Sequence, residues 1–454
     1  MRHVSGRAIR AVVKSMGQRA WVELTLRYGK TFRHGSLVIT CEPEAVRALL
    51  LDKAHTEVRA PLHKIMSVIP GANGILFMDG EKWVTRTRAL MPTFHRDHVD
   101  AFTPSLHAIV LAHLARWDAG GCVDDLYDAV QQIGVASVLE VGYGLDPQHP
   151  LTAELGRTLV EYKEFSMAAD SRRRLDEFGA GLEKLLDLPW VLTTLIGMHA
   201  RAADVRRAVR ALVANSDPAA HRSGWLTQLA GAGLSEAELA REINHLYGAF
   251  NAVDYIVTAA LCELARDRRL ADALRGELLS VLGDREPPAR NDLPRLPWTN
   301  AFMLEILRRY PVSMGILRRT GEPIELGGER LSSGTQVLVL LHALHHHPDF
   351  WDEPDALKPE RWIGSPSPKV AFSYVPFLDG SRKCIGRSMA EMHLLVVLSA
   401  IVRRVDVRVF HEPIVPPFMI PRFGAPIPFA VEAWTGERGS ERRPSATLYP
   451  AAER

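Results

Sequence analysis

The stretch Phe377-Leu-Asp-Gly-Ser-Arg-Lys-Cys-Ile-Gly386 places one cysteine, Cys384, in a loop directly before an apolar helix. Gly380 and Gly386 permit tight backbone turns on either side of the sulfur. The positive N-terminus of the helix and the guanidinium of Arg382 are expected to lower the pKa of the Cys384 thiol. A lone cysteine is most often a small buried hydrophobe, but a thiolate in this setting suits a soft metal site. The stretch therefore predicts a metal-bound thiolate.

Two further motifs precede the cysteine loop. Glu305-Ile-Leu-Arg308 has the i, i+3 spacing that puts both charged side chains on one face of a helix. Pro359-Glu-Arg361-Trp follows, with Arg361 lying 53 residues after Arg308 and 23 residues before Cys384. Together with the spacing of Phe, Gly, Arg, Cys and Gly in the cysteine loop, these motifs resemble those of the cytochrome P450 family. The resemblance extends over residues 20 to 430.

The resemblance implies a cytochrome P450 fold, mostly α with a smaller β-rich region. We expect one cytochrome P450 domain over residues 1–434 and a disordered polar tail over residues 435–454. Apolar periodicity predicts helices over residues 81–90, 97–118, 123–141, 151–168, 172–187, 201–215 and 386–402. Alternating residues predict strands within residues 32–40 and 324–341.

The resemblance also implies a heme b cofactor (iron protoporphyrin IX) with Cys384 as the ligand of its iron and Phe377, Gly380 and Gly386 in the cofactor-binding loop. A second implication is a structural cluster of charge-assisted hydrogen bonds that fixes the segment before this loop. Its members are Glu305, Arg308 and Arg361.

The two heme propionates need cations or hydrogen-bond donors. By the resemblance, Arg382, Arg318 and Trp83 hold them. The family often has Arg or His four residues after this tryptophan, and here that residue is Thr87. We expect Arg86 to take over the role, the alternative being that Arg86 simply faces solvent.

A long helix is predicted from Ser235 to Arg268, with Ser235 and Glu238 as a capping box. In the family this helix usually carries an acid followed by threonine, which relay protons to iron-bound dioxygen. Here the corresponding pair, catalytic by position, is Asn251 and Ala252, and neither side chain can titrate. Asp254 could relay in principle, although helix geometry moves it away from the iron.

Two interpretations of this pair remain open. The first is a monooxygenase in which substrate or water delivers the protons. The second is an enzyme that rearranges an activated O–O or N–O bond without dioxygen. A third possibility, from another class, is a non-catalytic heme sensor or docking protein. We favour monooxygenation of a small organic, secondary-metabolite substrate. The side chains expected around it are Asn244, Tyr247, Gly248, Val312, Met314, Ile316 and Met419, with the irregular loop over residues 60–78.

Composition excludes several other classes. The 454 residues carry a formal net charge of +2, which does not indicate nucleic-acid binding. Four widely separated cysteines fit a reducing cytoplasm. The basic first 20 residues lack a signal-peptide core, and we expect a frayed helix there, or one that touches a membrane. The longest apolar run, Leu394–Val402, is too short to be a transmembrane anchor.

Two expectations concern partners. Electrons, where used, would come from a separate ferredoxin or flavodoxin, to which Lys383 and Arg387 present positive charge. The run of histidines that ends at His347 is not expected to bind metal, because adjacent side chains diverge and no carboxylate or cysteine is suitably spaced.

Overall fold

The computed structural model describes residues 1–16, 19–51, 74–120, 122–172, 188–215, 229, 231, 233–364, 368–411, 413 and 423–434. The α-helices are α1 Gly6–Met16, α2 Ala20–Tyr28, α3 Pro43–Leu51, α5 Gly80–Leu90, α6 Arg96–Gly120, α7 Leu126–Ala136, α8 Pro150–Arg172, α9 Leu188–Asn215, α11 Glu236–Arg266, α12 Arg268–Leu282, α13 Pro297–Arg309, α14 Leu341–His346 and α15 Arg387–Val402. Short helical turns are η2 Ile75–Phe77, η3 Met91–Phe94, η4 Ser137–Gly142, η7 Arg290–Arg295, η8 Pro359–Trp362 and η9 Gly380–Arg382. The strands are β1 Arg2–His3, β2 Thr31–His34, β3 Leu37–Thr40, β4 Cys122–Val123, β5 Ile316–Arg319, β6 Ile324–Leu326, β7 Glu329–Leu331, β8 Gln336–Val339, β9 Val405–Val409 and β10 Phe429–Ala433.

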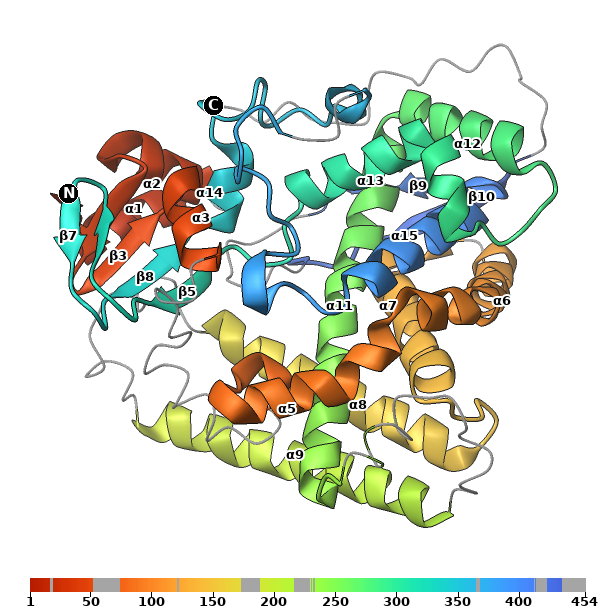
Figure 1. Cartoon of the computed structure of the whole chain (residues 1–454). Helices are drawn as coiled ribbons and strands as arrows, with labels where there is room; N and C mark the ends of the chain where they lie inside the picture. The colour runs from red at the N-terminus through yellow and green to blue at the C-terminus, as the bar shows by residue number, and fades with distance from the viewer. Residues whose placement is uncertain are drawn as a thin grey trace.

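A β-rich side and a larger helical side make up the molecule (Figure 1). The main sheet has the order β1-β2-β3-β8-β5, in which β3 and β8 are parallel neighbours with Val38 opposite Val337. β2 and β3 form a hairpin that turns through Gly35, whose φ of 57° favours glycine. The sheet thus joins the start of the chain to a segment far along it. This architecture confirms the predicted fold class.

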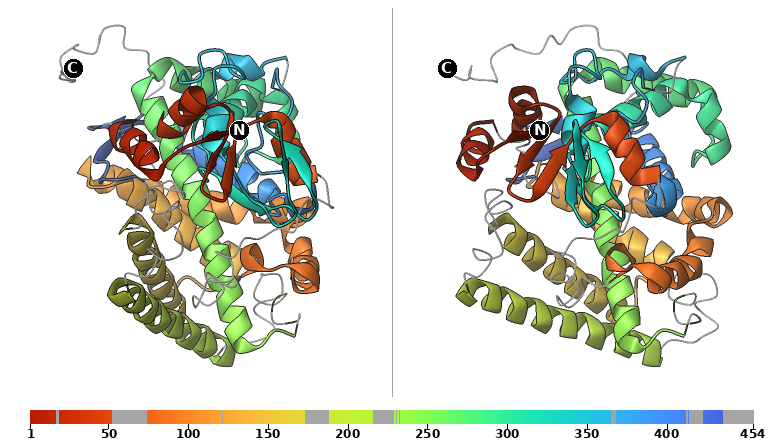
Figure 2. Two further views of the ribbon diagram at one scale, coloured as in Figure 1. Left: turned by 90° about the vertical axis from the view of Figure 1, so that its left-hand side faces the viewer. Right: turned by 60° about the vertical axis from the view of Figure 1, so that its left-hand side comes forward.

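The long helix α11 runs through the middle of the molecule (Figures 1 and 2). It begins with the predicted capping box: the Ser235 hydroxyl accepts a hydrogen bond from the Glu238 N–H, and the Glu238 carboxylate accepts one from the Ser235 N–H. It ends at Arg266, two residues before the predicted end, because Asp267 caps the following α12. Among the described helices only α11 is long and apolar enough to cross a membrane, and 71% of that stretch is buried inside the protein.

The predicted final helix is confirmed as α15, which is buried on nearly every side from Met392 to Val402. Its continuous apolar run therefore marks a core helix. The predicted helix over 123–141 is shorter, since Cys122 and Val123 pair with β10 and the last turn widens into the π-helical η4. The predicted segment 172–187 lies almost wholly outside the described residues.

The first helix differs from the sequence prediction. Neither fraying nor membrane contact describes α1, because its apolar face packs into the core on the β-rich side. Ile9 and Val12 are buried there, as is Val4 just before the helix, in the same cluster as Trp21 and Phe32. Burying these side chains removes the apolar face that a membrane surface would need.

The histidine run is structural. Within the described part of the chain, no group of three or more His, Cys, Asp or Glu side chains could hold a metal ion. The rings of His342 and His346 stack with centroids 4.2 Å apart, and Nε2 of His345 accepts a hydrogen bond from the Val375 N–H (3.1 Å). Burial lowers the pKa of His342 and of His345 to about 3, and that of His393 to about 4.

These histidines predict acid instability. Their folded-state pKa values lie below the unfolded value near 6.5, so the unfolded chain binds more protons at lower pH. The folded state has its full stability with respect to these histidines above pH ~6.5, where they are neutral in both states, and it loses stability as the pH falls toward ~3–4. We expect the free energy of unfolding in urea to fall by about 1.4 kcal/mol per pH unit for each such histidine. His345→Gln, which keeps a hydrogen-bond acceptor, should reduce this slope by one proton. The exposed His3→Gln should not, and an unchanged slope in His345→Gln would contradict the prediction.

Candidate functional site

The cysteine loop is shaped by its contact with α3. Gly380 opens η9 with a φ of 70°, and a Cβ placed there would lie 2.0 Å from the carbonyl oxygen of Leu50. Any other residue would force the loop off α3, as expected for this glycine. Gly386 differs from expectation, because its φ of −84° is open to every residue. A Cβ there would make only ordinary contacts, 3.8 Å from the Cys384 sulfur and from the Phe94 ring.

The Cys384 sulfur is held by backbone groups. The Cys384 N–H donates to the carbonyl of Phe377 (2.8 Å). Burial raises the pKa of the Cys384 thiol, and hydrogen bonds from the N–H groups of Gly386 and Arg387 offset this only in part. The prediction that Arg382 lowers this pKa is wrong, because Arg382 binds elsewhere. A coordinating metal ion would itself deprotonate the thiol.

Cys384 is an exposed residue, and burial nonetheless raises the pKa of its thiol. The exposure of the residue fits a cysteine that binds a further group.

Arg382 is fixed by the start of α5. Its guanidinium donates to the Met78 carbonyl (2.9 Å) and to the Asp79 carboxylate (2.7 Å). It also lies over the Trp83 ring, 3.9 Å from the centroid, which is a close cation–π contact. The structure therefore brings two of the predicted propionate-binding residues, Arg382 and Trp83, together.

Arg318 on β5 is a buried cation. It is 7% exposed, and among the described residues its side chain donates only to the carbonyl of the adjacent Leu317 (3.1 Å). Burial and the nearby Arg382 charge lower its pKa to about 10, while Asp79 acts in the opposite sense. Two guanidiniums therefore converge near one described carboxylate. A buried charge of this kind needs an anionic partner, and a heme propionate fits.

Arg86 does not take the place that the sequence suggested. It is buried, and its guanidinium binds Glu242 and Glu238 (3.1 Å) of α11. Glu242 is fully buried and also accepts a hydrogen bond from the Ile75 N–H (3.2 Å). Arg86 is therefore neither a propionate ligand nor a solvent-facing residue, which were the two expectations from the sequence. Its ion pairs connect α5 to the first half of α11.

Glu305, Arg308 and Arg361 form one cluster. Glu305 and Arg308 are fully buried and joined by two hydrogen bonds of 2.9 Å, and Arg361 donates to the same carboxylate (3.0 Å). The sequence did not indicate that the indole N–H of Trp362 and the backbone N–H of Lys358 also donate to Glu305 (2.9 Å each). Arg308 in turn donates to three carbonyls, those of His345, Pro354 and Ala356.

The middle of α11 opens onto free space. Gly248 and Ala249 are exposed although they lie within a core helix, and a Cβ on Gly248 would meet no atom within 4 Å. Asn251 and Ala252 follow on the same helix, and the Asn251 side chain lies outside what the structure describes. This exposure within a core helix is consistent with a cofactor and a substrate bound beside α11.

Asp254 faces away from that space. It is buried against α7, where a Cβ on Gly134 would come within 2.2 Å of its carboxylate. Burial raises the pKa of Asp254 and lowers the pKa of Lys163 on α8, with which it interacts. The sequence-based view that helix geometry moves Asp254 away from the site agrees with this position.

The predicted substrate residues differ in their exposure. Gly248, Val312 and Ile316 are exposed or half-buried and remain candidates. Met314 is fully buried in the core of the β-rich side, so it is corrected to a packing residue. Asn244 is buried and hydrogen-bonded to Tyr162 of α8, and the buried Tyr247 lies near Asp254. Met419 and most of the loop 60–78 lie outside the described residues.

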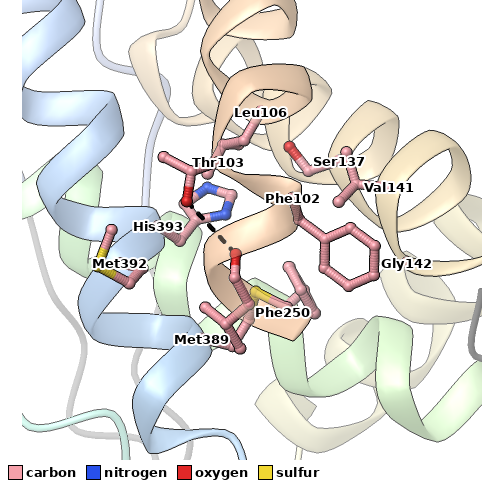
Figure 3. A pocket seen from close by; sticks show the side chains of 11 residues that line it. Phe102, Thr103, Leu106, Ser137, Val141, Gly142, Phe250, Met389, Met392 and His393 are labelled. Atoms are coloured by element: carbon pink, nitrogen blue, oxygen red, sulfur yellow. Dashed lines mark hydrogen bonds between the residues drawn. The ribbon is translucent and has the colours of Figure 1, made fainter. Parts of the chain in front are cut away.

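A separate apolar cavity does not belong to the candidate heme site. This cavity lies between α6, η4, α11 and α15 (Figure 3). Phe102, Met389 and His393 are among its lining residues, and the predicted site residues are not. The His393 ring there meets Phe250 edge-on at 5.9 Å, which is ordinary core packing.

Comparison with known proteins agrees with this geometry. The cytochrome P450 family model matches residues 226–428. Cytochrome P450 734A5 of Oryza sativa subsp. japonica is 25% identical, over 88% of this chain and 78% of its own length. Cyclooctatin synthase of Streptomyces melanosporofaciens is 26% identical, over 82% of this chain and 83% of its own length.

The solved structure of retinoic acid-bound cyanobacterial CYP120A1 superposes with a TM-score of 0.74 at 19% identity, covering 93% of this chain and 96% of that one. The chain thus belongs to the cytochrome P450 family. The family and the fold imply heme b as cofactor, which the accessible Cys384 sulfur and the buried Arg318 charge fit.

The Glu305 cluster yields a stability prediction. Glu305→Gln removes the charge shared by two arginines and leaves Arg308 buried without a counter-ion. We expect a loss of about 3–5 kcal/mol in the free energy of unfolding, measured by urea denaturation, with low yields of folded protein. Glu325→Gln, on the exposed side of β6, is the control and should change stability by less than about 0.5 kcal/mol. Equal stability of the two variants would contradict a structural role for the cluster.

Proposed function

We propose that this cytochrome P450 is a monooxygenase that acts on a small organic substrate, with Cys384 as the iron ligand. The observation that carries the proposal is the exposed residue Cys384, whose sulfur accepts hydrogen bonds from two backbone N–H groups in a loop that packs against α3 at Gly380. When bound, heme would supply the activation of dioxygen with electrons from a reductase. Arg318 and Arg382 would hold its propionates.

The proposed substrate class rests on the predicted substrate residues that remain candidates. Gly248, Val312 and Ile316 carry no charge that could bind an ionic group. A molecule with few polar atoms suits such side chains. Two relatives also support a monooxygenase of this kind: cyclooctatin synthase and cyclooctat-9-en-7-ol 5-monooxygenase of Streptomyces melanosporofaciens, the latter 24% identical. We therefore propose an uncharged, largely apolar secondary-metabolite substrate.

Proton delivery distinguishes this chain from an ordinary member of the family. Asn251 and Ala252 cannot titrate, and Asp254 is directed toward Lys163, away from the open space. Protons would therefore come from water or from a hydroxyl of the substrate. The lack of a titratable group at residues 251 and 252 also favours a second candidate reaction. This is the rearrangement of an activated O–O or N–O bond, which needs no external electrons.

A separate ferredoxin or flavodoxin is the proposed electron donor. Lys383 is exposed within the cysteine loop, and the Arg387 side chain just after it is 63% exposed although it is paired with Glu391 (2.8 Å). Positive charge at this face would attract an acidic partner.

The iron ligand can be tested by absorption. The reduced protein with carbon monoxide should show the red-shifted Soret band of thiolate-ligated heme, because the sulfur donates electron density to the iron. Cys384→Ser should lose this band, and Cys122→Ser, which replaces another exposed cysteine, should keep it. A normal band in Cys384→Ser would overturn the assignment.

The proton source can be tested by restoring the missing pair. For an apolar substrate selected by a spectral-shift screen, Asn251→Asp with Ala252→Thr should raise product formation with dioxygen and ferredoxin about tenfold, which corresponds to a barrier about 1.4 kcal/mol lower. Asn251→Gln, which still cannot titrate, is the control and should give no gain. Loss of activity in the double variant, with wild-type turnover in the absence of reductant, would support the rearrangement reaction instead.

A further inference from the structure

The cavity between α6, η4, α11 and α15 contains buried polar side chains as well as apolar ones (Figure 3). His393 of α15, Thr103 of α6 and Ser137 of η4 all line it, and all three are buried. Ser137 opens the π-helical turn of η4, and such widened turns often occur at functional sites. Three helical segments therefore bring polar atoms to one small space inside the core.

The His393 ring has no hydrogen-bond partner among the residues that the structure describes. The ring meets Phe250 edge-on, and burial alone lowers its pKa to about 4. It is therefore neutral near neutral pH, with one N–H donor and one nitrogen acceptor. The buried rings of His345 and His346, by contrast, are hydrogen-bonded to backbone groups. A buried donor that lacks a partner costs stability, so the His393 ring calls for a partner inside the cavity.

The two hydroxyls of the cavity can only accept further hydrogen bonds. Thr103 donates to the Val99 carbonyl (3.3 Å), and Ser137 donates to the Ile133 carbonyl (2.7 Å). Each hydroxyl oxygen keeps a lone pair that can accept another bond. The described lining residues include no Asp, Glu, Lys or Arg. The cavity therefore offers one ring N–H and two acceptor oxygens to a small neutral molecule.

The size of the cavity selects that molecule. The space open to the centre of a water molecule is about 10 Å³, and a single water needs roughly 10–15 Å³ by this measure. Buried waters typically make about three hydrogen bonds to polar groups that would otherwise be unsatisfied.

We infer that this cavity binds one ordered water, which accepts a hydrogen bond from the His393 ring and donates to the hydroxyls of Thr103 and Ser137. The water has two hydrogens for the two acceptor oxygens and a lone pair for the ring N–H, so donors and acceptors match. It joins α15, which begins just after Cys384, to α6 and η4. The water uses no atom of the heme and takes no part in the proposed reaction.

Crystallography and water relaxation provide the test. In a crystal of the wild-type protein, an ordered water should lie within about 3.2 Å of a His393 ring nitrogen and of at least one of the two hydroxyls. In solution, magnetic relaxation dispersion of water oxygen should count one long-lived water fewer in His393→Leu than in wild type. His393→Gln keeps an amide donor and should retain the water. His113→Leu is the matched control, because His113 is a buried histidine of α6 that does not line the cavity. It should leave the count unchanged.

The outcomes separate this inference from the proposed function. An empty cavity in the wild-type crystal overturns the inference, as does xenon in the cavity after pressurisation, because xenon enters dry apolar cavities. An equal water count in wild type and folded His393→Leu also overturns it. The crystal measurement needs no variant, so it decides the inference even where His393→Leu does not fold. A water on His393 in protein that lacks the thiolate Soret band would support this inference while the proposed function fails.

Discussion

The buried ion pair between Glu305 and Arg308 is the interaction on which the rest of the structure depends. Apolar packing is non-directional, so the large core around α11 and α15 does not by itself fix the path of the irregular chain between α14 and α15. The cluster does. Arg308 binds the carbonyls of His345, Pro354 and Ala356, and the Glu305 carboxylate binds the next turn, η8. Because an unpaired buried charge is so costly, the segment that leads to the cysteine loop has one acceptable arrangement.

Local sequence rules predicted the parts of the fold that local contacts determine. The capping box of α11 depends on two residues three positions apart, Ser235 and Glu238, and the predicted start of this helix is correct. Gly380 was expected in a tight turn, but its reason is a close approach to Leu50, which only the folded chain reveals. The residues of the Glu305 cluster could be named from their motifs, whereas the bond from Trp362 required coordinates.

Arg86 shows where the sequence could not suffice. Its partners Glu238 and Glu242 lie more than 150 residues away in the chain, and no local pattern distinguishes an arginine that binds a cofactor from one that binds a distant helix. Similarly, Arg382 was expected to act on the Cys384 thiol, but Asp79, brought near by the fold, takes its guanidinium. The direction of a long cationic side chain depends on which anions the fold brings near it, and this is set by tertiary structure.

The distribution of charge along α11 follows from the same rule. Its first turns carry Glu238 and Glu242, both committed to Arg86, and Asp254 farther on is buried against α7 beside Lys163. Between them, from Gly248 to Ala252, the helix has no titratable group where it borders open space. Every carboxylate in this part of α11 is therefore directed at other helices, and the stretch that would face a bound substrate is a neutral wall. Such a wall would suit the apolar substrate proposed above, with protons supplied by that substrate or by water that accompanies it.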